Sequence, residues 1–135
     1  MTGSGAWNPM FQLGLDVMDH QCLVIGGGPE AEEKTARLLR AGANVTVVSP
    51  DLTPELSRLA RQDRLRHQKR QFELDDLEGV FVVLNTNEME RAREIYDYCM
   101  ERRILVNTYD CVELSVMSMA ALVDPGHLRI SISTS

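Results

Sequence analysis

The chain has 135 residues, a mass of 15.2 kDa and a formal net charge of -6 at pH 7, which suits one domain with a hydrophobic core. Its 44% hydrophobic and 25% charged residues argue against disorder, and no apolar stretch approaches the roughly 20 residues of a membrane span. The acidic balance argues against nucleic acid as a partner, because phosphate binding needs a basic surface.

Residues 1–9 are rich in small and polar residues and lack the order of a secretion signal, in which basic residues precede an apolar run. We predict a flexible N-terminus there and a location in the cytoplasm. The cysteines form no C-x-x-C pair and the histidines are widely separated, so we predict neither a disulfide nor a metal site. We expect core positions for Cys22, Cys99 and Cys111, and surface or turn positions for His20, His67 and His127.

An apolar run, Cys22 to Ile25, stops at three glycines and is followed by a helical pattern. The run predicts a strand that is buried on both faces. Gly26, Gly28 and Ala31 have the spacing of the dinucleotide-binding fingerprint, in which small residues allow a tight turn and a close approach to a pyrophosphate. Pro29 suits the first turn of a helix, where free amides bind phosphate. A strand-to-helix turn that merely needs small residues is the alternative.

The next two elements lead to an acidic residue at the distance that the fingerprint requires. Residues 31–41 predict a helix that stops at Gly42, and residues 44–48 predict the second strand. Asp51 follows Gly28 by 23 residues, close to the roughly 20 at which a carboxylate meets the adenosine ribose. Such a carboxylate repels a 2′-phosphate, which favours NAD over NADP. A plain turn residue is the alternative role for Asp51.

The rest of the chain continues the alternation of strands and helices, which predicts a Rossmann-like, doubly wound, mostly parallel α/β sheet with helices on both faces. The carboxyl ends of parallel strands share one edge of a sheet, so the polar residues after each strand should meet the glycine turn. The predicted elements are helices at 53–62 and 88–102, an edge strand at 65–72, a central strand at 80–84 and a buried strand at 104–106.

The last segment changes pattern. Residues 120–123 and 128–133 alternate on either side of an Asp-Pro-Gly-His turn signal, which predicts an antiparallel strand pair. Leu128, Ile130 and Ile132 fall on one face, and that face needs cover. We therefore expect a domain over residues 10–117, followed at 118–135 by the start of a dimerisation region that crosses to a second copy. The alternative is a hairpin that folds back on its own sheet.

These residues together resemble the siroheme-synthesis family, the NAD-dependent precorrin-2 dehydrogenases, some of which are also sirohydrochlorin ferrochelatases. The resemblance covers residues 9–133, and several of its motifs are more specific than the glycine fingerprint. They are Cys22-Leu-Val-Ile-Gly-Gly-Gly with Lys34, Val45-Thr-Val-Val-Ser-Pro-Asp-Leu-Thr-Pro-Glu-Leu, Phe72 with Leu77 and Gly79, Ile104-Leu-Val-Asn with Asp110, and Leu122-Val-Asp with Ile130-Ser-Ile-Ser.

The resemblance implies the N-terminal NAD-binding part of an oxidoreductase of siroheme biosynthesis. It implies the oxidation of precorrin-2, a tetrapyrrole, to sirohydrochlorin, with iron insertion in bifunctional members, and a homodimer. It places the family's key aspartate at Asp110, where a carboxylate can take the proton that leaves the macrocycle; a strand-end cap is the alternative. The predicted cofactor-binding residues are Gly26, Gly27, Gly28, Pro29, Glu30, Ala31, Asp51, Leu52, Asn85, Thr86 and Asn87.

Two segments depart from the family pattern. The family has Ala-Thr-Asp-Asp where this chain has Asn85-Thr86-Asn87-Glu88, and it has proline and aromatic residues in the segment that corresponds to residues 111–120. Two other functions therefore stay open. A non-catalytic NAD-sensing module would need the glycine turn and Asp51 but not Asp110. A ferrochelatase without dehydrogenase activity is the second.

Overall fold

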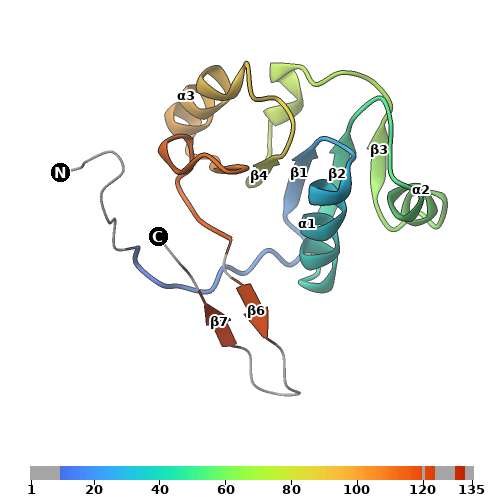
Figure 1. Cartoon of the computed structure of the whole chain (residues 1–135), viewed down its shortest axis with the longest axis horizontal. Helices are drawn as coiled ribbons and strands as arrows, with labels where there is room; N and C mark the ends of the chain where they lie inside the picture. The colour runs from blue at the N-terminus through green and yellow to red at the C-terminus, as the bar shows by residue number, and fades with distance from the viewer. Residues whose placement is uncertain (1–9, 120, 124–129, 133–135) are drawn as a thin grey trace.

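The computed structural model describes residues 10–119, 121–123 and 130–132. A five-stranded parallel sheet has the strand order β3-β2-β1-β4-β5, and two further strands, β6 and β7, form a separate antiparallel pair (Figure 1). The chain builds the sheet outward from β1 in one direction and then, from β4, in the other. This arrangement confirms the predicted Rossmann-like fold, and it creates a switch point between β1 and β4.

The centre of the sheet is β1 (Gln21–Ile25), which pairs with β2 on one side and β4 on the other. Its last four residues are buried, as predicted for a strand covered on both faces. The helix α1 (Pro29–Arg40) follows and begins two residues before the predicted start, because Pro29 is already held at a helical φ. It ends near Gly42, whose φ of +86° favours glycine.

The strand β2 (Asn44–Val48) has its predicted bounds. The helix α2 (Pro54–Arg61) begins after its N-cap Thr53, whose side-chain oxygen accepts a hydrogen bond of 3.2 Å from the Leu56 amide. The strand β3 (Arg66–Gln68) lies at the sheet edge, as predicted, but it is shorter than the predicted 65–72. The Arg70 amide donates to the Gln68 carbonyl at 2.9 Å, which turns the chain away from the sheet.

The acidic stretch after β3 forms a short 3-10 helix, η1 (Leu74–Leu77), and leads to β4 (Val82–Asn85), which is buried along its whole length. The strand lies between β1 and β5, in the interior of the sheet as predicted. Because β4 extends to Asn85, the polar residues that follow it start at the sheet edge that holds the glycine turn.

The helix α3 (Ala92–Arg102) begins four residues later than predicted. The Asn85 side-chain oxygen accepts hydrogen bonds from the amides of Asn87 and Glu88, at 3.2 and 2.8 Å, and this holds the segment in a turn. The helix buries Ala92, Ile95 and Cys99. Met89, which precedes the helix, and Met100, on its outer side, are both 43% exposed.

The strand β5 (Leu105–Thr108) lies one residue later than predicted at its start and two at its end. A short 3-10 helix, η2 (Val112–Leu114), separates it from β6 (Ala121–Val123) and β7 (Ile130–Ile132). Ala121 pairs with Ile132 and Val123 with Ile130, which confirms the predicted antiparallel pair. The predicted flexible segment 1–9 and the predicted turn at 124–127 lie outside the described residues.

The two faces of the sheet carry two hydrophobic clusters. The helices α1 and α2 cover one face through residues that include Ala31, Leu38 and Leu56. The helix α3 and η1 cover the other face, where Ile95 and Leu77 pack on Val83 and Ile25. Figure 1 shows α1 in front of β1 and β2, and α3 to the side of β4.

Candidate functional site

A cleft of about 460 Å³ opens at the carboxyl end of the sheet, where the turns after β1, β2 and β4 meet. Nine of its lining residues are among the predicted cofactor-binding residues, and Ser49 and Thr53 are additional. The lining residues are Gly27, Gly28, Pro29, Glu30, Ala31, Ser49, Asp51, Leu52, Thr53, Thr86 and Asn87. In open α/β sheets, ligands bind in a crevice of this kind at the switch point.

The first two positions of the turn require glycine, because neighbouring atoms leave no room for a Cβ. Gly26 has a φ of +112°, its amide donates to the Val48 carbonyl at 3.0 Å, and a Cβ at this position would collide with the Thr86 hydroxyl. A Cβ on Gly27 would collide with the Asp51 carbonyl. These glycines therefore let the turns after β1, β2 and β4 touch, and Gly26 lies buried beneath the cleft.

Gly28 has a different role, because a Cβ built on it meets no atom within 4 Å. It is the N-cap of α1 and has no side chain to pair with the amides of the first turn. Those amides, in Glu30 and Ala31, have no acceptor within the helix, and both residues line the cleft. The structure therefore presents unpaired donors and open space at the positive end of α1, as the binding of a phosphate requires.

The turn after β2 brings Asp51 to the opposite wall of the cleft. The Ser49 hydroxyl donates to the Asp51 carbonyl at 2.8 Å, and the Thr53 amide donates to the Gly27 carbonyl at 3.0 Å. These two bonds fix the backbone on both sides of Asp51, whose side chain is exposed. A carboxylate held in this way can accept hydrogen bonds from a pair of hydroxyl groups on a ligand.

The turn after β4 closes the third side. Thr86 donates through its hydroxyl to the Ile25 carbonyl at 2.7 Å, and Asn87 is exposed at the surface of the cleft. Asn85 is only 1% exposed, and its amide group bonds to the backbone of Asn87 and Glu88, so it shapes the turn and does not face the cleft.

Asp110 lies two residues beyond β5, on the same edge of the sheet. The Tyr109 amide donates to the Asn85 carbonyl at 2.8 Å, which ties this segment to the turn after β4. Asp110 is exposed and has a φ of +55°, which a short polar side chain tolerates. The Glu30 carboxylate, through its charge and a hydrogen bond, raises the pKa of the Tyr109 phenol, with a contribution from burial.

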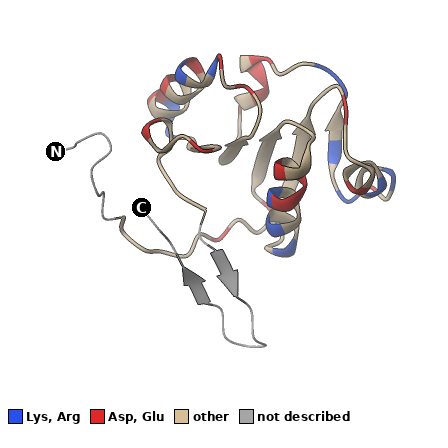
Figure 2. Ribbon diagram, viewed as in Figure 1, with Lys and Arg blue, Asp and Glu red and all other residues tan. Residues whose placement is uncertain are grey.

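Among the described residues, no lysine or arginine lines the cleft, and the acidic residues Glu30 and Glu32 lie in the first turn of α1 (Figure 2). An anion bound there would be held by backbone amides alone. A dinucleotide site combines backbone amides that bind the pyrophosphate with a nearby carboxylate that accepts hydrogen bonds from ribose hydroxyl groups. The residues present therefore fit a dinucleotide.

Within residues 10–119, 121–123 and 130–132, no group of three or more His, Cys, Asp and Glu side chains is arranged to hold a metal ion. Cys22 and Cys99 are buried, as predicted, whereas Cys111 is half-buried next to Glu113. None of the helices in the described part of the chain is long and apolar enough to cross a membrane.

Comparison with known proteins identifies the family. Residues 13–121 match the family model described as "Putative NAD(P)-binding". A siroheme synthase of Thioalkalivibrio sulfidiphilus is 38% identical over 125 residues, which are 92% of this chain and 26% of that protein. A precorrin-2 dehydrogenase of Bacillus subtilis is 31% identical over 127 residues, which are 93% of this chain and 78% of that protein.

A solved structure agrees with these relatives. The protein titled "SirC, precorrin-2 dehydrogenase" superposes with a TM-score of 0.81 at 26% identity, over 93% of this chain and 62% of the other. This chain thus spans about a quarter of the length of the siroheme synthases it matches and less than two thirds of the SirC chain. The chain belongs to the NAD(P)-binding family that includes the precorrin-2 dehydrogenases and the corresponding part of the siroheme synthases.

Proposed function

We propose that this protein uses NAD to oxidise precorrin-2 to sirohydrochlorin in siroheme biosynthesis. The observation that supports this most is the position of the cleft: an uncapped α1 N-terminus and Asp51 face each other, and Asp110 follows the neighbouring strand. The relatives that carry the same fold are named for this chemistry or for siroheme synthesis.

In this proposal the glycine turn and the first turn of α1 hold the pyrophosphate of NAD. The Asp51 carboxylate accepts hydrogen bonds from the adenosine ribose and would repel the 2′-phosphate of NADP. Thr86 and Asn87 lie toward the nicotinamide half, and Asn85 supports them from below. When bound, NAD supplies the acceptor for a hydride from the macrocycle.

The proposed role of Asp110 is that of a general base. Loss of a hydride from one carbon of precorrin-2 must be accompanied by loss of a proton, and an ionised carboxylate at the strand edge can accept that proton. Its left-handed backbone at φ +55° sets the side chain apart from the regular strand. In a bifunctional protein the same carboxylate would accept pyrrole protons during iron insertion.

We also propose a homodimer through residues 118–135, with one NAD site in each copy. The pair β6 and β7 stands apart from the five-stranded sheet (Figure 1), and the extended segment before β1 exposes large apolar side chains that a second copy would cover. Phe11 is 87% exposed and Leu13 66%. We place the protein in the cytoplasm, where free thiols such as Cys22 and Cys99 stay reduced.

The test is to incubate the protein with precorrin-2 and NAD without oxygen, and to follow the visible spectrum together with NADH absorbance. We expect sirohydrochlorin and NADH to form in equal amounts. Tight NAD binding with no change in the spectrum would select a sensing module. Metal insertion into added sirohydrochlorin, without NADH formation from precorrin-2, would select a ferrochelatase alone.

A second test addresses the choice of cofactor. Asp51→Ser removes hydrogen bonds to a charged group, which are worth about 1.5–3 kcal/mol each, so NAD affinity should fall by roughly 10- to 100-fold. NADP affinity should rise, because the repulsion of its 2′-phosphate is gone. Calorimetric titration with both nucleotides measures the two constants. Equal losses for NAD and NADP would contradict the assignment of Asp51 to the ribose.

A further inference from the structure

One buried cation has no place in the proposed mechanism. Lys34 lies in the second turn of α1 and is only 8% exposed, beside the core residues Ala31 and Leu38. Its closest carboxylate is that of Glu33, at 4.0 Å, and Glu33 has a side chain that is 56% exposed. The other contact is with the Tyr109 ring, whose centroid is 5.9 Å from the Lys34 Nζ.

This position is unfavourable for a lysine in terms of stability. The Lys34 side chain is only 9% exposed, and an exposed carboxylate at 4.0 Å compensates little for the burial of a charged side chain. Residues that break a local rule of stability without compensation are those to examine for function.

The neighbours of Lys34 connect it to the end of β5, where Asp110 lies. Tyr109 lies between α1 and the end of β5: its ring centroid is 5.9 Å from the Lys34 Nζ, and the charge of Glu30, which lines the cleft, raises the pKa of its phenol. Asp110 is the next residue along the chain. Lys34 does not line the cleft itself; it lies one turn of α1 beyond Glu30, on the side of Tyr109.

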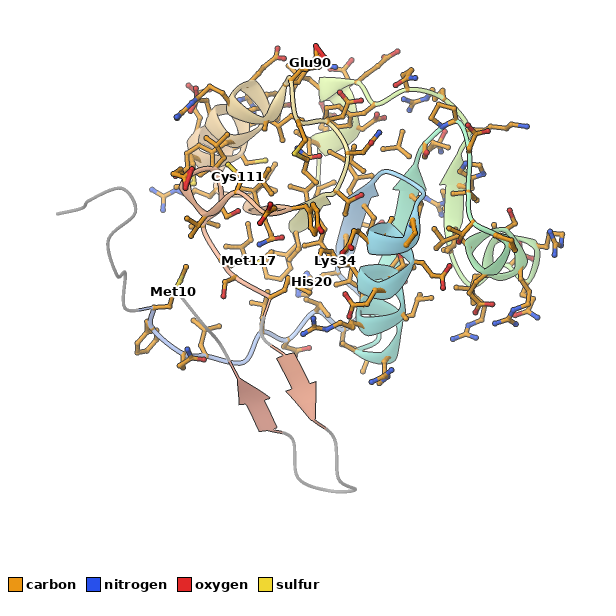
Figure 3. The ribbon with its side chains drawn as sticks, viewed as in Figure 1. Met10, His20, Lys34, Glu90, Cys111 and Met117 are labelled. Carbon is orange, nitrogen blue, oxygen red and sulfur yellow. The ribbon has the colours of Figure 1, made fainter. Side chains whose placement is uncertain are left out.

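The segment after η2 adds to the hydrophobic cluster on this face of the sheet. Met117 and Met119 from that segment pack against the same cluster as Phe81 and Leu105. The Asn107 side chain donates to the Met117 carbonyl at 2.9 Å, which fixes that segment to β5. In Figure 3, Lys34 extends from α1 toward the side on which Met117 lies.

We propose that Lys34 binds a carboxylate of the substrate. This inference rests on the proposed function, since tetrapyrroles at this stage carry several acetate and propionate side chains. The Lys34 ammonium group receives one of these carboxylates beside the Tyr109 ring, which orients the macrocycle toward Asp110. The substrate carboxylate then provides a negative charge next to the Lys34 ammonium group, and the low polarity of the buried site strengthens this ion pair.

The first test compares variants of the only two lysines in the sequence. Lys34→Met keeps the apolar stem and removes the charge; Lys69→Met does the same at an exposed position after β3. For Lys34→Met we expect the KM for precorrin-2 to rise at least about 10-fold, as for a lost hydrogen bond to a charged group, with kcat little changed. NAD affinity should not change, Lys69→Met should match the wild type, and Lys34→Arg should restore most of the KM.

The melting temperature separates a binding role from a structural one. Lys34→Met should melt at or above the wild-type temperature, because it replaces a poorly paired cation with an apolar group. An unchanged KM in Lys34→Met, or a loss of NAD affinity equal to the rise in KM, would overturn the inference. A wild-type protein that does not oxidise precorrin-2 would instead refute the proposed function.

The second test does not depend on turnover. Reductive methylation with 13C-labelled formaldehyde puts NMR labels on both lysines, and the two Met variants assign the signals. Sirohydrochlorin should shift the Lys34 signal and leave the Lys69 signal in place, whereas a tetrapyrrole with esterified acids should shift neither. A Lys34 signal that does not move at saturating sirohydrochlorin, or that responds to NAD alone, would overturn the inference.

Discussion

At the residue scale, the three glycines of the turn after β1 have separable roles, and substitution distinguishes them. Gly27→Ala forces a methyl group against the Asp51 carbonyl, so we expect the free energy of unfolding to fall by about 1–3 kcal/mol. Gly28→Ala points into open space and should cost less than about 1 kcal/mol, as for a weaker N-cap. Urea titration measures both differences.

NAD affinity should respond to these substitutions in the opposite order, with the larger loss of binding in Gly28→Ala. Gly28→Ala places a methyl group where the backbone must approach a pyrophosphate, so NAD should bind at least about 10-fold more weakly in a protein of nearly native stability. If Gly28→Ala keeps full NAD affinity, the phosphate does not lie over Gly28.

The buried thiols predict a specific dependence of stability on pH. Burial raises the pKa of both Cys22 and Cys99 to about 11 from an ordinary value of 9. Above pH 9 the unfolded thiols lose protons that the folded ones retain, so stability falls between pH 9 and pH 11, by up to about 1.4 kcal/mol per pH unit for each thiol.

Denaturant titration across this range checks the slope. Cys111→Ala is the control and should leave it unchanged, because this half-buried thiol lies outside the core. In the native protein at pH 8, a thiol reagent should modify Cys111 first. A flat profile, or rapid modification of all three cysteines, would show that Cys22 and Cys99 are not sealed in the folded state.

Sequence patterns located most of the cleft but assigned two side chains incompletely. The glycine spacing and the distance to Asp51 are local features, so they place the turns after β1 and β2 correctly. Asn85 is among the predicted cofactor-binding residues, and the sequence does not show that its buried amide group also holds the turn that carries Thr86 and Asn87. Lys34 shares the buried face of α1 with Ala31 and Leu38. A search for apolar residues at helical spacing does not identify this position, because lysine is charged.

At the element scale, the N-cap of α2 is a clear test, because a single side chain carries it. Thr53→Ala removes the acceptor of the Leu56 amide and should lower the free energy of unfolding by about 1 kcal/mol. Thr53→Ser keeps the oxygen and should stay close to the wild type. Thermal denaturation of the three proteins gives the comparison. Equal losses in both variants would assign the effect to the lost methyl group.

Element boundaries depended on tertiary contacts that no local pattern contains. The predicted start of α3 at residue 88 follows the polar and apolar spacing, but the Asn85 turn delays the helix to Ala92. The strand β3 ends at Gln68 because the chain must leave the sheet edge to reach η1 on the other face. Both misplacements leave the order of the elements, and hence the switch point, unaffected.

At the scale of the whole molecule, the prediction concerns assembly. The alternation of buried strands with helices predicts the parallel sheet. The sequence pattern of a single copy does not predict which surface covers β6 and β7. We expect light scattering at micromolar concentration to give twice 15.2 kDa. Truncation before residue 118 should give a monomer that still binds NAD. A mass near 15.2 kDa for the whole chain would contradict the dimer.

An NMR titration of the 15N-labelled chain with NAD tests the dinucleotide site at the switch point. We predict that amide shifts gather in the three turns around the cleft: Gly27 to Ala31, Asp51 to Thr53, and Thr86 to Asn87. Smaller shifts should reach Tyr109 and Asp110 at the end of β5. Shifts centred instead on β2 and β3, or no shifts at millimolar NAD, would contradict a dinucleotide site at the switch point.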